Sequence, residues 1–222
     1  MLHALSRVNP LRGYKRKMKY WMLMFMLAVA MPLPASERVV LVLGDSLSAA
    51  FGINPKDGWV SLLQQRLDTR GGGWRVVNAG ISGDTTAGGL SRLPHLLELH
   101  RPQLVIIELG SNDGLRGFGF DQIRTNLRRM IALSRGSGAK VVLVGARLPP
   151  NYGVAYADAF HRLFLEVAES EQVSLVPFLL EGVAQDRSLM QGDGYHPNAE
   201  AQLRLLENVW PTLESSMKTS SR

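Results

Sequence analysis

The sequence predicts an α/β fold of three layers, with helices on both faces of a mostly parallel, five-stranded sheet of the flavodoxin-like kind. Two observations predict it: short apolar runs alternate with segments of helical periodicity, and polar and apolar residues do not alternate within the runs. Strands that are covered on both faces need such continuous runs, and this alternation indicates right-handed crossovers between parallel strands. Ligands bind such sheets beyond the carboxyl ends of the strands.

Each predicted strand is a short run that contains Val, Ile or Leu. In chain order the strands are 39–43 (VVLVL), 74–78 (WRVVN), 104–109 (LVIIEL), 140–145 (KVVLVG) and 174–176 (SLV). Between them apolar residues recur every three or four positions, as Ile123, Leu127 and Met130 do, and the arginines among them fall on a solvated face. The predicted helices are 58–70, 89–100, 121–134, 156–171 and 199–210.

Composition fits one globular domain over 36–222, preceded by a segment of different character. The formal charge of +6 comes entirely from the first 35 positions, which hold six basic residues and no acidic one. The rest of the chain is neutral and carries no electrostatic footprint for nucleic acid. The six basic residues are Arg7, Arg12, Lys15, Arg16, Lys17 and Lys19.

The basic segment leads into an uninterrupted apolar stretch at 21–31, followed by Pro-Leu-Pro-Ala and polar residues. This pattern is typical of a cleavable signal peptide, predicted at 1–35, and a retained anchor is the alternative. The stretch is shorter than the ~20 residues that span a bilayer, so no stable membrane span is expected after cleavage. Cleavage is expected after Ala35 or, alternatively, Ala30, and Met18 is an alternative start. We expect a periplasmic protein, with secretion as the second choice.

The chain contains no cysteine, so thiol nucleophiles and cysteine metal sites are excluded. Serine, histidine and carboxylates remain as candidate reactive groups. His95 and His100 are five positions apart, which does not match a helical metal pair. We therefore expect neither a metal nor a cofactor.

A candidate nucleophile follows the first strand in Gly-Asp-Ser, where Ser46 lies at the carboxyl end of the strand and at the start of a helix. Ser46 either caps this helix or attacks a substrate, which requires a neighbouring base and a group that orients the base. His196 lies in a turn-rich segment before the last helix, three positions after Asp193. This spacing allows the carboxylate to fix the tautomer of the imidazole. The alternative is that Asp193 closes an Asx-turn and His196 caps the helix.

Two further loops offer hydrogen-bond donors for an oxyanion. Gly83 follows the second strand in NAGISGDT, and Asn112 follows the third strand in GSND. Neither motif is specific alone, since Gly and Asn are common in loops. Together with Ser46 they bring donors to the ends of three successive strands, and Asp45 and Asp113 are expected to brace the turns beside them.

These blocks resemble those of the SGNH or GDSL hydrolases. The family's four blocks match in order: Gly-Asp-Ser-Leu at 44–47, Gly83, Gly-x-Asn-Asp at 110–113 and Asp-x-x-His at 193–196. The longer stretches LGDSLSAAFG, ELGSNDGLRGFG and DGYHPN further resemble the bacterial periplasmic acyl-CoA thioesterase, lysophospholipase and arylesterase group. The Gly-x-Ser-x-Gly elbow of the other large group of serine hydrolases is missing from the Ser46 motif.

The resemblance implies a serine hydrolase in which Ser46 is the nucleophile, His196 the base and Asp193 the orienting group. It implies an oxyanion hole formed by the N–H groups of Ser46 and Gly83 and the amide of Asn112. The substrates implied are small acyl esters and thioesters, including aryl esters, acyl-CoA and lysophospholipids. The protein is expected to act as a monomer.

The loops 114–119 and 147–153 are expected to flank a shallow acyl groove, with Leu115, Phe118 and Leu148 in contact with the acyl chain. One alternative is an acetylesterase of the same family that acts on carbohydrate or cell-wall acetyl groups. A second is a phosphate- or flavin-binding module without catalysis, and a third is a noncatalytic descendant of the family. The second is disfavoured because Asp45 would repel an anion and the glycine patterns of phosphate loops are missing there.

Overall fold

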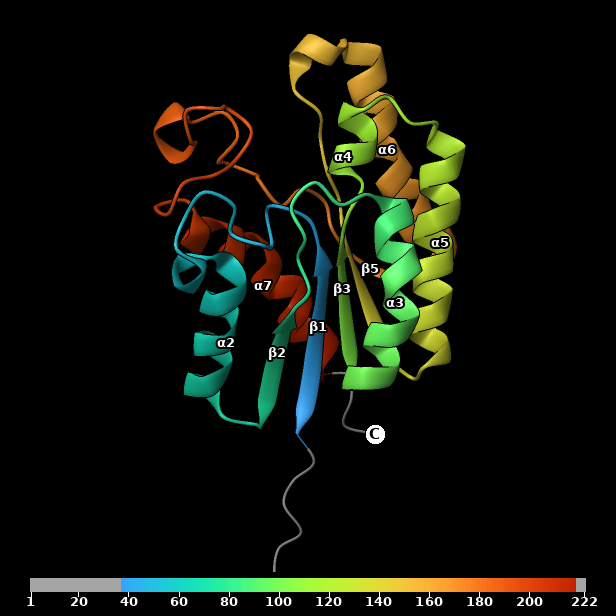
Figure 1. Ribbon diagram of the computed structural model, residues 1–222, viewed down its shortest axis with the longest axis vertical. Coiled ribbons are helices and arrows are strands. Elements are labelled where there is room, and N and C mark those ends of the chain that lie inside the picture. Colours follow the sequence, from blue (N-terminus) through green and yellow to red (C-terminus); the bar gives the residue numbers. More distant parts are fainter. Residues whose placement is uncertain (1–36, 219–222) are drawn as a thin grey trace, which may run out of the picture. The chain divides into compact units, whose positions relative to one another are not determined.

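The computed structural model describes residues 37–218, and within them five parallel strands form one sheet in the order β2-β1-β3-β4-β5 (Figure 1). Every neighbouring pair is parallel, which confirms the predicted α/β class. The predicted signal peptide at 1–35 lies outside the described residues. The strands are β1 (Arg38–Gly44), β2 (Trp74–Asn78), β3 (Leu104–Glu108), β4 (Lys140–Val144) and β5 (Ser174–Val176).

Helices cover both faces of the sheet, as Figure 1 shows: α2 and α7 lie on one face, and α3, α5 and α6 on the other. No helix within 37–218 has the length and apolar character needed to cross a membrane. The helices are α2 (Trp59–Arg70), α3 (Thr86–His100), α4 (Ser111–Leu115), α5 (Phe120–Gly136), α6 (Val154–Glu171) and α7 (Gln202–Lys218), with short 3-10 turns η1 (Pro55–Asp57), η2 (Pro150–Tyr152) and η3 (Arg187–Leu189).

The continuous apolar runs are explained by burial on both faces of the strands. In β1 the side chains of Val40 and Val42 pack with α2 and α7, whereas Leu41 and Leu43 pack with the helices of the opposite face. Successive side chains of a strand point to opposite faces, so a strand between two helical layers needs apolar residues at every position.

The segment after Ser46 is not the start of a helix, which corrects the sequence-based expectation. Residues 46–52 form consecutive turns, and the next regular helix begins at Trp59. Ala49 N–H donates to Asp45 O, but Ala50 then adopts a left-handed backbone conformation with φ of 57°. That conformation ends helical hydrogen bonding, so the hydroxyl of Ser46 lies in a turn.

Two other helix boundaries differ from the predictions. The short α4 at Ser111–Leu115 was expected to be loop, and α7 continues through Pro211, where a stop was expected. Pro211 removes one backbone donor, but the helical turns beyond it bury the side chains of Leu213 and Ser216. Tertiary packing therefore outweighs the local preference of proline.

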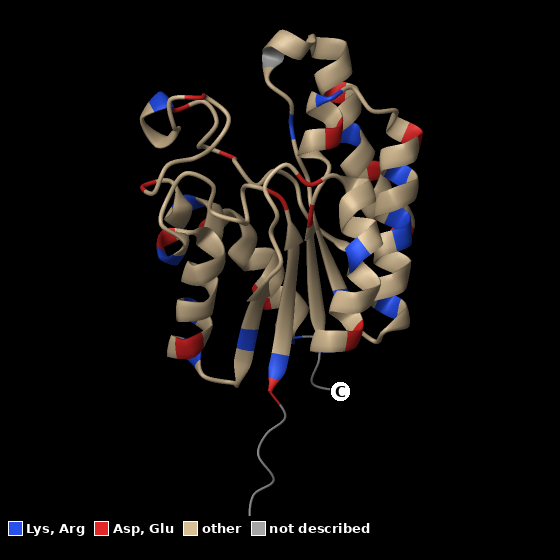
Figure 2. Ribbon diagram, in the orientation of Figure 1, with Lys and Arg blue, Asp and Glu red and all other residues tan. Residues whose placement is uncertain are grey.

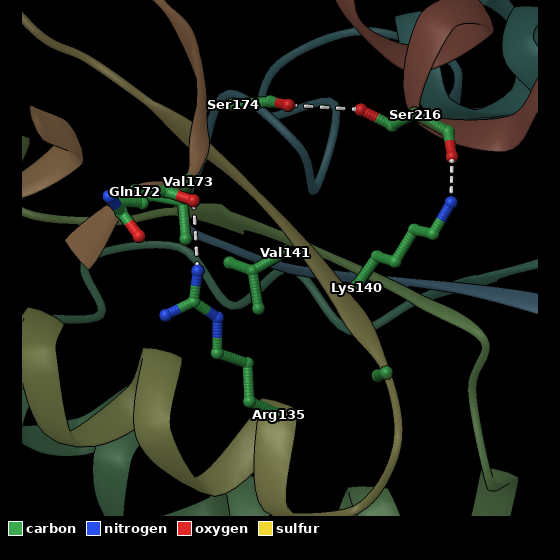
Figure 3. A pocket seen from close by; sticks show the side chains of 8 residues that line it. Arg135, Lys140, Val141, Gln172, Val173, Ser174 and Ser216 are labelled. Atoms are coloured by element: carbon green, nitrogen blue, oxygen red, sulfur yellow. Dashed lines mark hydrogen bonds between the residues drawn. The ribbon is translucent and has the colours of Figure 1, made fainter. Parts of the chain in front are cut away.

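The two ends of the strands differ. At the amino-terminal ends of β4 and β5 a cavity of about 390 Å³ is bordered by Arg135 and Lys140 (Figure 3). Arg135 donates to Gln172 O, the cap of α6, at 2.9 Å, and Lys140 donates to Ser216 O in the last turn of α7 at 2.8 Å. Cations are favourable at the carboxyl ends of helices, so both side chains have structural partners. The candidate site lies at the other end of the sheet, beyond the carboxyl ends of the strands.

Candidate active site

Ser46 lies directly beyond the carboxyl end of β1, in a turn with little room for a side chain at position 44. A Cβ on Gly44 would lie 2.4 Å from Ser48 Oγ and 2.8 Å from Glu108 Oε2. The Leu47 N–H donates to Asp45 Oδ1 at 3.0 Å and closes the turn. Ser46 is 9% exposed and borders a second cavity, so its hydroxyl is held in a defined position at the edge of a cavity.

Ser46, His196 and Asp193 are brought together although the first two are 150 positions apart. His196 Nε2 lies 3.0 Å from Ser46 Oγ, and His196 Nδ1 lies 2.7 Å from Asp193 Oδ2. Asp193 Oδ1 also accepts the backbone N–H groups of Tyr195 and His196. Asp193 therefore closes a turn and contacts the imidazole at once, so the two interpretations of this residue are not exclusive.

Electrostatics keep the Asp193 carboxylate ionised. Burial acts to raise its pKa, but hydrogen bonds from the His196 ring and from two backbone N–H groups outweigh that effect and lower the pKa to about 2. An ionised carboxylate only accepts hydrogen bonds, so it favours the tautomer with the proton on Nδ1. Nε2, which faces Ser46, is then free to accept a proton.

Two residues near His196 carry no local sequence signal and were missed. The Phe51 ring packs against the imidazole with centroids 4.5 Å apart. Gln191 Nε2 donates to Phe51 O at 2.7 Å and to Pro197 O at 3.0 Å. These contacts connect the turn of Ser46 to the loop of His196, a juxtaposition that appears only when the chain is folded.

Asn112 bridges the segments that carry the other two predicted oxyanion donors. Its Nδ2 donates to Asp45 Oδ2 at 3.1 Å and to Asp84 O at 2.9 Å. Asp45 precedes Ser46, and Asp84 follows Gly83. Gly83 has a left-handed backbone (φ 79°) and is not among the residues that line the cavity.

Buried carboxyl groups lie beneath the Ser46 turn. Burial raises the pKa of Asp45 from its ordinary value of 3.8 to about 6, although the Leu47 N–H and the nearby His196 favour its ionised form. Burial, and next the charge of Asp45, raise the pKa of Glu108 well above its ordinary value. Glu108 Oε2 accepts Ser48 Oγ at 2.7 Å and Asp45 N at 3.2 Å. Asp45 directly follows β1 and Glu108 is the last residue of β3, and Figure 2 shows acidic positions in red at this end of the sheet.

Asp113 braces the start of α4 against α3. Its two oxygens accept the backbone N–H of Thr86 at 2.9 Å and the hydroxyl of Thr86 at 2.5 Å. Burial raises the pKa of Asp113, and these two hydrogen bonds partly offset the effect. The residue therefore fixes the neighbouring Asn112 rather than facing the cavity.

The cavity beside Ser46 has a volume of about 590 Å³ and mainly apolar walls. Leu115 and Leu148 line it, as predicted, but Phe118 is not among the lining residues. Of the histidines in residues 37–218, only His196 borders it. Tyr152, from the loop 147–153 that was expected to flank the groove, and Leu47, next to Ser46, also line it. Sequence reasoning missed the wall residues that come from segments farther along the chain: Phe178, Leu180, Ala184, Met190 and Tyr195.

Charged side chains of α5 and α6 pair with one another on the surface. No group of three or more His, Asp or Glu with metal-binding geometry occurs among residues 37–218. Figure 2 shows basic residues along α5. Two residues of this helix, Arg124 and Arg128, pair with Glu166 and Glu171 of α6 at 3.0 and 3.3 Å. These arginines are thus partly neutralised on the surface.

A comparison with family models identifies the class of protein to which this fold and site belong. The GDSL-like Lipase/Acylhydrolase family model matches residues 42–204, a span that begins in β1 and ends in α7. The chain therefore belongs to the GDSL-like lipase/acylhydrolase family and is a hydrolase.

Curated relatives are similar over most of their length. Esterase TesA of Pseudomonas aeruginosa is 56% identical over 180 residues, covering 81% of this chain and 90% of the relative. An arylesterase of Vibrio mimicus is 50% identical over 79% of this chain and 87% of the relative. Thioesterase 1/protease 1/lysophospholipase L1 of Escherichia coli K12 is 41% identical over 82% of this chain and 86% of the relative.

Solved structures agree with the fold. The crystal structure of TesA has a TM-score of 0.79 and 56% identity, covering 80% of this chain and 99% of that chain. The psychrotrophic esterase EstA of Pseudoalteromonas, inhibited by monoethylphosphonate, has a TM-score of 0.78 and 38% identity, covering 82% of this chain and 100% of that chain. The three-layer α/β architecture is thus the one found in SGNH hydrolases.

Proposed function

We propose that this protein is a serine esterase and thioesterase that hydrolyses acyl esters and thioesters through an acyl-enzyme on Ser46. One observation carries the proposal: Ser46 Oγ, His196 Nε2, His196 Nδ1 and Asp193 Oδ2 form a continuous chain of contacts at 3.0 and 2.7 Å. These contacts lie at the edge of an apolar cavity that is large enough for an acyl group. The names of the relatives, which include esterase, arylesterase and thioesterase, support the same reaction class.

Acylation begins when Ser46 Oγ attacks the acyl carbonyl carbon and His196 Nε2 accepts the hydroxyl proton. The carbonyl double bond opens, and its electron pair becomes the charge of an oxyanion. The oxyanion then re-forms the carbonyl and expels the alcohol or thiol, which receives the proton from His196. Asp193 stays ionised and stabilises the imidazolium in between.

The oxyanion is stabilised by the N–H groups of Ser46 and Gly83 and by the amide of Asn112. Both N–H bonds of Asn112 Nδ2 have acceptors within the protein, Asp45 Oδ2 at 3.1 Å and Asp84 O at 2.9 Å. These two hydrogen bonds orient the amide before substrate binds. Donors that are held in advance need no reorganisation during the reaction.

Deacylation repeats the same steps with water. His196 takes a proton from the water as its oxygen attacks the acyl carbon, and the proton then returns to Ser46 Oγ as the acid leaves. No other group is required, so the proposed enzyme needs neither a metal nor a cofactor.

The proposed substrates are aryl esters, acyl-CoA thioesters and lysophospholipids, with the acyl chain in the cavity. Leu115, Leu148 and Phe178 provide apolar walls, and burial of each methylene contributes about 0.8 kcal/mol to binding. We further propose that the enzyme works as a monomer in the periplasm after removal of 1–35.

A fluorophosphonate probe tests the mechanism, because it reacts covalently with an activated serine. We expect labelling and p-nitrophenyl ester hydrolysis in the wild type and loss of both in Ser46→Ala, while Ser48→Ala, two positions away, still labels. Substrates of increasing acyl length test the cavity. A strong preference for acetyl esters would instead favour a carbohydrate or cell-wall acetylesterase.

A further inference from the structure

Arg92, in the first half of α3, ends in a guanidinium group that donates to three separate points of the backbone and side chains around the site. Nε donates to Asp84 Oδ2 at 2.9 Å, Nη1 to Ala79 O at 2.6 Å and Nη2 to Gly44 O at 3.2 Å. Nη2 also lies 2.9 Å from Asp84 Oδ2. One side chain thus connects α3 to the end of β1 and to two points of the loop after β2.

Two of these points, Gly44 and Asp84, lie close to donors of the proposed oxyanion hole. Gly44 is two positions before Ser46, and Asp84 follows Gly83. The backbone carbonyl of Asp84 in turn accepts the Asn112 amide at 2.9 Å. All three donors are therefore within one or two residues, or one hydrogen bond, of a contact of Arg92.

The loop after β2 also contacts the end of β1 and the turn of Ser46. The distance between the loop and the turn therefore depends on the contacts that hold the loop. Ile81 N–H donates to the same Gly44 O at 3.1 Å. Gly80 packs against the Ser46 turn so closely that a Cβ there would lie 2.6 Å from Ala49 N. A small shift of the loop after β2 would consequently move Gly83 relative to Ser46.

We propose that Arg92 is a positioning residue for ester hydrolysis: its guanidinium sets the distances among the Ser46 N–H, the Gly83 N–H and the Asn112 amide. This inference rests on the proposed function of these three donors. Arg92 is not among the residues that line the cavity, so it acts through them and not on the substrate.

The chemistry of the guanidinium suits this role better than that of an ammonium group. A planar guanidinium presents donors in fixed directions, whereas lysine offers a single point charge. Oxyanion donors must lie about 2.7–3.1 Å from the oxygen, and displacements of about 1 Å can lower the rate about 100-fold. The side chains of Arg92 and Asp84 are 21% and 11% exposed, so solvent weakens this pair only partly.

Arg66 provides a matched control. Its side chain is also 21% exposed and also pairs with a carboxylate, Glu207, between α2 and α7. Arg92→Lys, Arg92→Gln, Arg66→Lys and Arg66→Gln are compared in steady-state p-nitrophenyl ester hydrolysis, with urea unfolding of each variant. We expect kcat to fall about 10- to 100-fold for the Arg92 variants with KM nearly unchanged, and wild-type kcat for the Arg66 variants.

A double-mutant cycle and a rescue experiment separate positioning from stability. If Arg92 acts through the oxyanion donors, Arg92→Gln costs less in an Asn112→Ala background than in the wild type. Added guanidinium ion at low concentration is expected to restore part of the kcat of Arg92→Gln. If Arg92 had only a structural role, neither the non-additive loss nor the rescue by guanidinium would be observed. Arg92→Lys replaces Arg92→Gln in the cycle if Arg92→Gln does not fold.

Wild-type kcat in folded Arg92 variants, or losses fully additive with Asn112→Ala, would overturn the inference. Such results leave the proposed function intact as long as Ser46→Ala is inactive and unlabelled. Full activity of Ser46→Ala would instead overturn the proposed function itself.

Discussion

Replacement of Asn112 by alanine tests the oxyanion hole most directly. The change removes an amide that donates to Asp45 Oδ2 at 3.1 Å and to Asp84 O at 2.9 Å, and with it one proposed oxyanion donor. Loss of one such donor typically lowers kcat by about 10²- to 10³-fold, which corresponds to about 2.7–4 kcal/mol of transition-state stabilisation. KM is expected to change little, because the amide acts on the charge that develops in the transition state.

The same change also weakens the fold, and the magnitudes separate the two effects. Asp45 is 1% exposed, and a buried acceptor that loses its donor costs about 1–3 kcal/mol. A domain with a stability of about 5–15 kcal/mol retains at least about 2 kcal/mol, which keeps more than about nine-tenths of the molecules folded. Unfolding therefore cannot account for a hundredfold loss of kcat.

The assay combines p-nitrophenyl ester kinetics with urea unfolding at the same temperature. Gln64→Ala is the control, because this amide also makes two contacts with β2, accepting Val76 N–H at 2.6 Å and donating to Trp74 O at 3.0 Å. Both variants are expected to lose stability, but only Asn112→Ala is expected to lose kcat. A kcat within twofold of the wild type would refute the role of Asn112.

Three further predictions follow from the site. The native pKa of Asp45, about 6, lies above its ordinary 3.8, so the native state binds more protons than the unfolded chain between these values and stability falls as pH rises through them. Asp45→Asn removes this pH dependence. In urea unfolding, the free energy of unfolding of Asp45→Asn relative to the wild type should therefore rise by up to about 3 kcal/mol between pH 4 and 8. A difference between the two proteins that stays constant with pH would contradict the burial argument. Asp193→Asn is expected to lower kcat by about 10⁴-fold through the wrong histidine tautomer, measured on the same ester, and near-normal kcat would remove Asp193 from the mechanism. Ala184→Trp fills the cavity and should lower kcat/KM for dodecanoyl esters at least about tenfold while butanoyl esters react normally, whereas Trp at the exposed Ala155, outside the cavity lining, should leave both unchanged.

The sequence alone was enough to predict the fold class and to propose which side chains are the reactive groups. Continuous apolar runs such as 39–43 occur where both faces of a strand are covered, so five runs separated by helical periods were enough to predict the parallel sheet. The carboxyl ends of parallel strands lie at the same end of a sheet, so the sequence predicts that Ser46 and Asn112 lie near each other. Asp193 and His196 are three positions apart, so their contact is local.

Tertiary structure alone decided the features that depend on segments far apart in the chain. The contacts of Phe51 and Gln191 at His196, the burial of Glu108 beneath Ser46 and the three bonds of Arg92 have no periodic or local signal. Phe118, expected at the substrate, is absent from the cavity lining, and Ser46 lies in a turn instead of a helix. The physical reason is that side-chain direction in irregular loops follows from what packs against them, and that packing exists only once the layers have assembled.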